Sequence, residues 1–287
     1  MSRIAYVNGQ YVTHAQASVH IEDRGYQFAD GVYEVCEIRD GYIVDFTRHM
    51  ERLDRSLSEL SIAWPLSRNA MIHVIRETVR RNGVASGMFY LQVTRGVARR
   101  DHVFPAKSVP SSLVITAKRI DRASGNLRAD KGISVITVPD NRWERVDIKT
   151  VGLLSNVMAR QKAKDQGAAE AWYVDESGCV TEGAATNAWI VTQDGALVTR
   201  PAENGILRGV TRTTLFDLAK KLSLRIEERA FSVDEAKRAR EAFISAATTL
   251  VMPVVSIDGS IIANGSPGSI ALSLRDAFFD VAEKIRA

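Results

Sequence analysis

Lys149 is the residue of this sequence that most readily suggests chemistry. It follows residues 146–148, a short run typical of the end of a strand. It precedes a segment with apolar residues at helical spacing: Leu153, Leu154, Val157 and Met158. A lysine at a buried junction between strand and helix loses hydration, so its pKa falls and its amine becomes nucleophilic. The competing interpretation is a solvated surface lysine, the common case before a helix.

Two further stretches have residue types that bind a charged ligand. Glu182 follows an apolar run and precedes the small residues GAAT, which allow another group to approach closely. A carboxylate buried there needs a cationic partner, whereas an exposed turn glutamate does not. Residues 206–214 (ILRGVTRTT) place Gly209 and Thr211 at the start of a predicted helix. Free N–H groups and a hydroxyl at such a start bind phosphate, although many helices begin in this way.

Arg100 and His102 lie two positions apart, so in an extended segment their side chains project to one side. An arginine fork with a second donor binds a carboxylate. The loop 96–110 contains other arginines, and solvated charge is the simpler interpretation of this pattern.

Together, an activated lysine, an inward carboxylate and a phosphate-binding helix start meet the requirements of pyridoxal phosphate. The lysine binds the cofactor covalently, the carboxylate keeps the pyridine nitrogen protonated, and the helix start binds the phosphate. The sequence lacks GxGxxG, GxxxxGK[ST] and GxSxG motifs, which removes the commonest nucleotide-binding and hydrolase interpretations.

The elements that must position these residues favour an α+β fold. Asn8-Gly9 predicts a hairpin between residues 4–7 and 10–13. Strands and helices are segregated and turn signals are frequent, which is typical of α+β folds rather than of a doubly wound sheet. Ser67, Ser232 and Ser266 predict helix starts. The helices are expected near residues 47–60, 67–82, 150–167, 211–222, from 232, and 266–285.

Length and composition indicate a globular protein of one large or two modest domains. The chain has 287 residues, 45% of them hydrophobic and 25% charged. Residues 119–131 (RIDRASGNLRADK) are polar. We therefore expect a linker there, between a small N-terminal domain (1–118) and a large cofactor-binding domain (132–287).

The same composition limits the partners. The net charge is only +4 and no basic run occurs, which speaks against nucleic acid. The two cysteines and five histidines lack the spacing of a metal site or a disulfide framework. No apolar segment approaches the ~18 residues that span a bilayer. We expect a cytoplasmic protein that binds small molecules and neither metal nor membrane.

Five motifs along nearly the whole chain resemble those of the class IV (fold-type IV) pyridoxal-phosphate aminotransferases, and most of all those of the D-amino-acid (D-alanine) transaminases. They are EDRGYQFADGVYEV at 22–35, VTRGVARRDH at 93–102, RWERVDIKTVGLLSNVMARQKA at 142–163, VTEGAATNAWIV at 180–191 and ILRGVTRTT at 206–214. The resemblance implies two α/β domains with pyridoxal 5'-phosphate between them, in a homodimer whose active sites use residues of both subunits.

The resemblance also implies individual roles. Lys149 would form the Schiff base and move the proton at the substrate Cα, and Glu182 would pair with the pyridine nitrogen. The residues implied to bind the phosphate are Arg52, Val210, Thr211 and Thr248, with Thr249 or the Ala247 amide as alternatives to Thr248. The residues implied to bind the substrate α-carboxylate are Tyr33, Arg100 and His102. Ala184, Ala185 and Thr186 stand where close D-amino-acid transaminases carry serines, which leaves the amino-acid range open.

This pattern predicts transfer of the amino group of a D-amino acid, of the D-alanine or D-glutamate class, to 2-oxoglutarate or pyruvate. The position of the carboxylate decides which enantiomer presents its α-hydrogen to the lysine. Branched-chain L-aminotransferases generally lack the Arg-x-His pair. The alternatives are a branched-chain L-amino-acid or (R)-amine transaminase, then an aminodeoxychorismate lyase, and last a cofactor-binding protein without enzyme activity.

Overall fold

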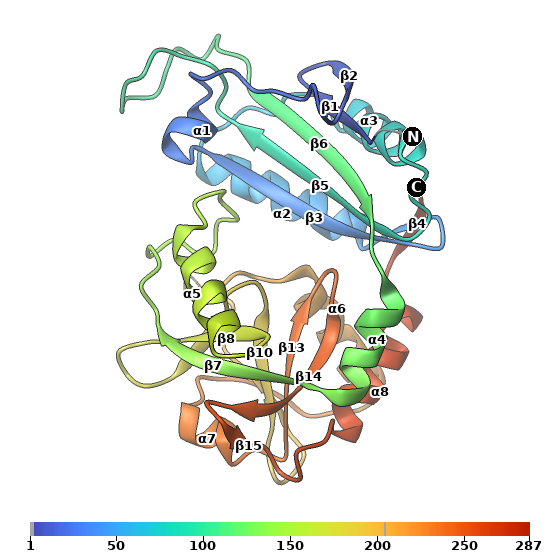
Figure 1. Cartoon of the computed structure of the whole chain (residues 1–287), viewed down its shortest axis with the longest axis vertical. Coiled ribbons are helices and arrows are strands. Elements are labelled where there is room, and N and C mark those ends of the chain that lie inside the picture. Colours follow the sequence, from blue (N-terminus) through green and yellow to red (C-terminus); the bar gives the residue numbers. More distant parts are fainter. Residues whose placement is uncertain (1–2, 204) are drawn as a thin grey trace. The chain divides into compact units, whose positions relative to one another are not determined.

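The computed structural model describes residues 3–203 and 205–287, and the chain divides into two compact units (Figure 1). The first unit comprises Met1–Ile120, Ile148–Gly152 and Glu283–Ala287. The second comprises Asp121–Asp147 and Leu153–Ala282. The chain therefore returns twice to the first unit, which the predicted division into 1–118 and 132–287 does not anticipate.

A seven-stranded sheet forms the framework of the first unit. Its strands are β1 (Ile4–Val7), β2 (Gln10–Thr13), β3 (Gly31–Arg39), β4 (Tyr42–Val44), β5 (Gly87–Thr94), β6 (Ser112–Arg119) and β16 (Lys284–Arg286). Neighbours pair antiparallel in the order β16-β4-β3-β5-β6-β1-β2. The Asn8-Gly9 hairpin is confirmed: both residues have positive φ (45° and 96°), as a tight two-residue turn requires.

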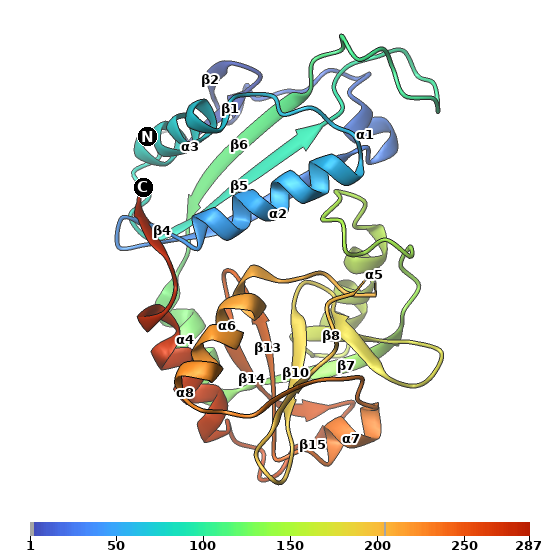
Figure 2. The same ribbon diagram turned by 180° about the vertical axis from the view of Figure 1, so that it is seen from behind.

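Two long helices cover one face of this sheet (Figures 1 and 2). They are α2 (Phe46–Glu59) and α3 (Arg68–Arg81), and a short helix, α1 (Arg24–Phe28), precedes β3. Leu53 of α2, Ile75 of α3 and Phe89 of β5 are buried in the core between helices and sheet. Ser67 caps α3 as expected, because its side chain accepts a hydrogen bond from the Ala70 amide.

A nine-stranded mixed sheet forms the framework of the second unit. Its strands are β7 (Ile133–Pro139), β8 (Glu170–Val174), β9 (Val180–Gly183), β10 (Asn187–Val191), β11 (Leu197–Thr199), β12 (Ile226–Glu228), β13 (Glu241–Ala246), β14 (Leu250–Ile257) and β15 (Ser260–Ile261). The order is β12-β11-β10-β13-β14-β7-β8-β9, with β15 beside β14. β7 is parallel to both of its neighbours, β14 and β8.

The helices of the second unit are α4 (Arg122–Lys131), α5 (Leu154–Asp165), α6 (Val210–Lys221), α7 (Val233–Lys237), α8 (Ser269–Ala277) and the 3-10 turn η1 (Phe278–Asp280). The segment 119–131, expected as a linker, contains the boundary between the two units at Ile120 and Asp121, but α4 occupies most of it. Asp121 caps this helix by accepting from the Ser124 amide, and Ala129 is buried. Arg275 donates to Asn126 (2.9 Å), which ties α4 to α8.

Three other expectations about secondary structure are wrong. Residues 144–147 form a turn and not a strand, since Asp147 is buried against Arg145 (2.9 Å). α5 begins only at Leu154. The last helix ends at Ala277, and Ile285 lies in β16, where it pairs with Ile43 of β4. Among the residues described, no helix is both long enough and apolar enough to cross a membrane.

Candidate active site

Lys149 lies in an irregular segment that pairs with the edge of β3 in the first unit. The Tyr33 amide donates to the Lys149 carbonyl (3.0 Å), and Thr150 forms an antiparallel bridge with Val32. β4 pairs only with the C-terminal end of β3, so this part of the edge accepts a segment from elsewhere in the chain. Ile148 is buried in the core of the first unit and fixes the segment beside Lys149.

The Lys149 side chain is half-buried and contacts a predicted substrate-binding residue. Its Nζ atom lies 4.2 Å from the centroid of the Tyr33 ring, within the range of a cation–π contact. Tyr33 stacks on Tyr90 (centroids 5.6 Å apart, interplanar angle 29°). Burial, with the neighbouring Tyr33, raises the pKa of Tyr90 to about 12. The structure thus brings Lys149 and Tyr33 together.

Arg52, which the resemblance assigns to the phosphate, extends from α2 to the buried Glu34 of β3. Its Nε and Nη2 atoms donate to the two Glu34 oxygens, each at 2.7 Å. His49 Nδ1 lies 2.7 Å from the same carboxylate. Burial alone would raise the pKa of Glu34, but Arg52 and His49 outweigh it and lower that pKa to about 2. Burial lowers the pKa of His49. Glu34 therefore fixes the direction of the Arg52 fork.

We expect Glu34→Gln to lower the free energy of unfolding by about 3 kcal/mol, because it leaves the Arg52 guanidinium buried without its counter-charge. The pKa of Glu34 falls from 4.5 to about 2 on folding. Its contribution is therefore full above about pH 4.5 and is lost as the pH falls toward about 2. Urea unfolding at several pH values measures both effects.

The matched control is Glu77→Gln, which removes a carboxylate that binds Arg80 and Arg81 at a partly exposed site on α3. We expect little change in stability from this variant. Equal acid dependence in the wild type and in Glu34→Gln would contradict the assignment.

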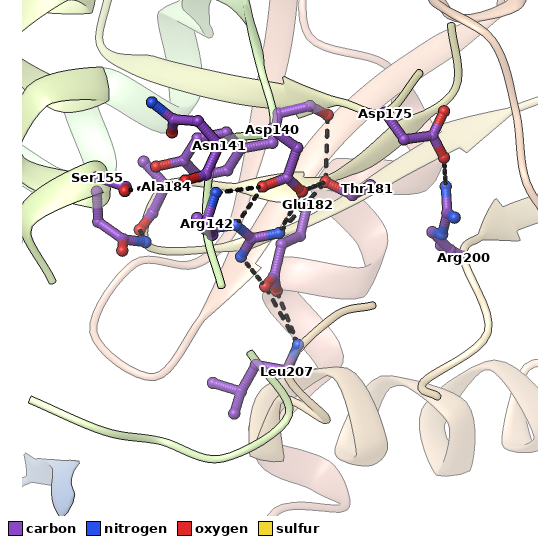
Figure 3. A network of polar contacts seen from close by, with 12 residues as sticks. Asp140, Asn141, Arg142, Ser155, Asp175, Thr181, Glu182, Ala184, Arg200 and Leu207 are labelled. Carbon is purple, nitrogen blue, oxygen red and sulfur yellow. Dashed lines mark hydrogen bonds and ion pairs between the residues drawn. The ribbon is translucent and has the colours of Figure 1, made fainter. Parts of the chain in front are cut away.

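Glu182, in β9 of the second unit, is buried, and its partners include Arg142 and Leu207, which Figure 3 labels, and Asn187. Arg142 Nη1 donates to its Oε1 atom (2.5 Å), and Asn187 Nδ2 donates to Oε2 (3.1 Å). The Leu207 amide lies 3.2 Å from both oxygens. Arg142 is thus the cationic partner that a buried Glu182 requires.

Arg142 also binds a second carboxylate, that of Asp140, through its Nε (2.9 Å) and Nη2 (2.7 Å) atoms. Its guanidinium lies 4.4 Å from the centroid of the Tyr173 ring. Burial acts to raise the pKa of Asp140, but hydrogen bonds and charge from Arg142 lower it below its ordinary value. The formal charge of Asp140, Arg142 and Glu182 together is −1. A buried group of this charge favours a cationic ligand atom, such as a protonated ring nitrogen.

The residues implied to bind phosphate in the second unit lie at two turns of the chain. α6 begins at Val210, and its N-cap, Gly209, has no side chain to bind the first N–H groups. Residues 247–249 join β13 to β14, and the Thr249 hydroxyl is buried without a hydrogen-bond partner. Such a hydroxyl is costly unless a ligand or an ordered water binds it, so Thr249 stays an alternative to Thr248. Both turns fit an anionic ligand.

Arg100 and His102 lie in the exposed part of the 96–110 loop of the first unit. Both pack on Phe28: the Arg100 guanidinium is 5.2 Å and the His102 ring 5.5 Å from its centroid. The backbone bends at Arg100 and His102 and is not extended as expected, but both side chains contact the Phe28 ring. Tyr33 instead contacts Lys149 and Tyr90. The three residues implied to bind the carboxylate therefore form two groups with different neighbours.

Sequence reasoning missed several residues of these sites. Glu34 had a local signal, since it lies on the same face of β3 as the buried residues Val32, Cys36 and Ile38. A carboxylate on a core face needs a partner. The other residues missed are His49, Asp140, Arg142, Asn187 and Leu207, of which Arg142, Asn187 and Leu207 stand within the motifs 142–163, 180–191 and 206–214.

The Thr186 hydroxyl, at a position where close D-amino-acid transaminases carry a serine, is bound within the protein. Its Oγ1 atom donates to the buried Glu170 (3.3 Å), and its backbone carbonyl accepts from the Gly183 amide (2.7 Å). Within the described ranges, no group of three or more His, Cys, Asp and Glu side chains could hold a metal ion.

Comparison with known proteins identifies the family of the chain. The sequence pattern of class IV aminotransferases matches residues 31–257. The chain is 38% identical over 274 residues to the D-alanine aminotransferase of Staphylococcus haemolyticus, with 95% of each chain covered. The chain therefore belongs to the class IV aminotransferases.

Two solved structures show the same fold. One is the branched-chain amino acid aminotransferase of Escherichia coli, with 24% identity, a TM-score of 0.90 and coverage of 98% of this chain and 95% of that chain. The other is the T.th. branched-chain amino acid aminotransferase with pyridoxamine 5'-phosphate, with 25% identity, a TM-score of 0.89 and coverage of 98% and 94%. The predicted α+β, fold-type IV architecture is confirmed.

Proposed function

We propose that this chain is a pyridoxal 5'-phosphate-dependent D-amino-acid transaminase. It moves the amino group of a D-amino acid, of the D-alanine or D-glutamate class, to a 2-oxo acid such as 2-oxoglutarate or pyruvate. The observation that carries this proposal is the 38% identity with a D-alanine aminotransferase over 95% of both chains. The two branched-chain structures share the fold but only 24% and 25% identity, so the D-specific function is favoured.

The residues assigned to the cofactor would bind different parts of it. When bound, pyridoxal phosphate supplies a ring that accepts the electrons released as the substrate loses its α-proton. Lys149 would hold the cofactor and move that proton. Glu182 would bind the ring nitrogen and keep it protonated, in accord with the net negative charge that it forms with Asp140 and Arg142. The residues that would bind the phosphate are Arg52, Val210, Thr211 and Thr248, with Thr249 or the Ala247 amide as alternatives to Thr248.

Tyr33, Arg100 and His102 bind the α-carboxylate in this proposal, with the arginine fork as the main contact. Tyr33 lies beside the Lys149 amine, whereas Arg100 and His102 are exposed on a loop. The two groups become one site if the loop serves the partner subunit of a homodimer. The cytoplasmic location belongs to the same proposal.

Exposed apolar side chains support the homodimer. Leu154, Val157 and Met158 of α5 are 73%, 60% and 61% exposed, although their spacing predicts an apolar helix face. Val103 and Phe104, in the loop of Arg100, are 71% and 59% exposed. Apolar side chains gathered on one element in this way are typical of surfaces that contact another chain.

We expect Arg100→Ala to raise the KM for D-alanine and D-glutamate about 30-fold, because it removes a charge-assisted fork from the carboxylate. The visible absorbance of the bound cofactor should not change. Steady-state kinetics with both amino donors measure the effect, and Arg99→Ala, an exposed neighbour on the same loop, is the matched control. An unchanged KM in Arg100→Ala would remove the carboxylate-binding role.

Mixed dimers test whether the loop acts across subunits. A hybrid of an Arg100→Ala chain and a Lys149→Ala chain has one intact site if Arg100 serves the partner, and none if it serves its own chain. Activity with the low KM of the wild type, appearing only after the two variants are unfolded and refolded together, indicates that Arg100 serves the partner. Absence of that activity in verified hybrids contradicts it.

An absorbance scan with D-alanine, L-leucine and (R)-1-phenylethylamine, each as sole amino donor, tests the function. We expect D-alanine to change the spectrum of the bound cofactor fastest. Preference for L-leucine or the amine would instead support the branched-chain or amine transaminase. Pyruvate release from aminodeoxychorismate without an acceptor would support the lyase, and no spectral change with any donor would contradict an enzyme.

A further inference from the structure

A buried cluster of three charged side chains lies at the base of the loop that carries Arg100 and His102. Asp30 immediately precedes β3, and Arg95 immediately follows β5, at the paired ends of these neighbouring strands. Arg24 is the first residue of α1. Arg24 Nε (2.8 Å) and Arg95 Nε (2.7 Å) both bind Asp30 Oδ2. All three side chains are at most 10% exposed, and none has a role in the function proposed above.

Both arginines, besides binding Asp30, contact residues of the loop. Arg24 Nη1 donates to the backbone carbonyl of Asp101 (2.6 Å), the residue between Arg100 and His102. The Arg95 guanidinium lies 3.6 Å from the centroid of the Phe104 ring, two residues beyond His102. The middle and the far end of the segment 96–104 are therefore both attached to one buried ion cluster.

The first residue of the segment, Gly96, is attached to α1, the helix that begins with Arg24. The Arg24 amide donates to the Gly96 carbonyl (2.9 Å), and Arg24 lies 4.8 Å from the Phe28 centroid. Phe28 is the ring on which Arg100 and His102 pack. α1 thus supplies both the backbone contacts and the apolar surface of the loop.

We propose that Arg24, Asp30 and Arg95 are positioning residues, which hold residues 96–104 in the conformation that presents Arg100 and His102 to the substrate α-carboxylate. The proposal rests on the carboxylate-binding role given to Arg100 and His102 in the proposed function. An exposed loop of this length has many conformations, and ordering it during binding would weaken the substrate complex. The buried cluster orders the loop before substrate arrives, without touching the substrate itself.

The variant Arg24→Lys tests the hydrogen bond from Arg24 to the Asp101 carbonyl separately from the ion pair with Asp30. A lysine keeps one charged nitrogen for Asp30 but cannot also reach the Asp101 carbonyl, which needs the arginine fork. We expect the KM for D-alanine to rise about tenfold while kcat changes less than about twofold, with the cofactor absorbance unchanged. The control is Arg119→Lys, which removes a similar bond to the Gly83 carbonyl (3.0 Å) at the opposite end of β6, and its KM should not change.

A double variant distinguishes positioning from an independent effect. If Arg24 acts through the loop, Arg24→Lys raises the KM clearly less in the Arg100→Ala background than in the wild type, because only the contact of His102 is then left to position. Multiplication of the two KM effects, or a loss of thermal stability with no change in KM, overturns the proposal. If Arg24→Lys does not fold, Arg95→Lys, which loses the stacking on Phe104, takes its place in the same cycle.

The single variants separate this proposal from the proposed function. A raised KM in Arg100→Ala with an unchanged KM in both Arg24→Lys and Arg95→Lys overturns the positioning role alone. An unchanged KM in Arg100→Ala overturns both.

Discussion

Lys149→Ala is expected to abolish transamination and the visible absorbance of the bound cofactor. The amine that this variant removes holds the cofactor and moves the substrate α-proton in the proposed function, and it lies beside the Tyr33 ring. Loss of a nucleophile that also acts as acid and base lowers turnover by at least about 10⁴-fold. Initial rates with D-alanine and 2-oxoglutarate, together with an absorbance spectrum of the purified protein, measure both losses.

The control for this prediction is Lys118→Ala, which removes an exposed lysine from β6 of the same unit. We expect wild-type rates and spectrum from it. A yellow and fully active Lys149→Ala protein would exclude Lys149 as the catalytic lysine.

Glu182→Gln is expected to lower kcat by about 10²- to 10³-fold, the range seen when one preorganised electrostatic contact to a reacting system is removed. The neutral amide no longer keeps the ring nitrogen protonated. Arg142 keeps its two bonds to Asp140, so we expect the fold of the second unit to persist. The thermal midpoint and the cofactor spectrum show whether the protein remains folded and loaded.

Glu176→Gln is the matched control, because Glu176 is an exposed carboxylate in the turn between β8 and β9. We expect its kcat to match the wild type. A kcat within about twofold of the wild type in cofactor-loaded Glu182→Gln would mean that Glu182 does not act on the ring nitrogen.

The two predictions differ in how far sequence alone could support them. The spacing around Lys149 indicated a junction before a helix, but residues 146–148, expected as the end of a strand, lie in a turn and the bend that follows it. The motif positions assign the catalytic role to Lys149 independently of this error, and that role stays a prediction. For Glu182, sequence reasoning required a cationic partner without naming it. Arg142 is 40 residues away in the chain, and no local pattern connects the two.

Elements governed by short-range interactions were predicted well. The Asn8-Gly9 hairpin depends on two residues with positive φ, and the caps at Ser67 and Ser232 each bind an amide three residues ahead. Local sequence patterns give the wrong element where its conformation depends on pairing with a segment far away in the chain. Ile285 has a helical spacing in the sequence, but pairing with β4 places it in a strand.

The sequence by itself determined the family of this protein, the identity of the catalytic lysine and glutamate in the proposal, and the local elements around them. These depend on residue types at fixed positions in the chain. The tertiary structure decided which side chains meet: Arg52 with Glu34, Arg142 with Glu182, Lys149 with Tyr33, and Arg24 and Arg95 with Asp30. Such pairs form only when folding brings distant segments together, and burial then makes each charge require its partner.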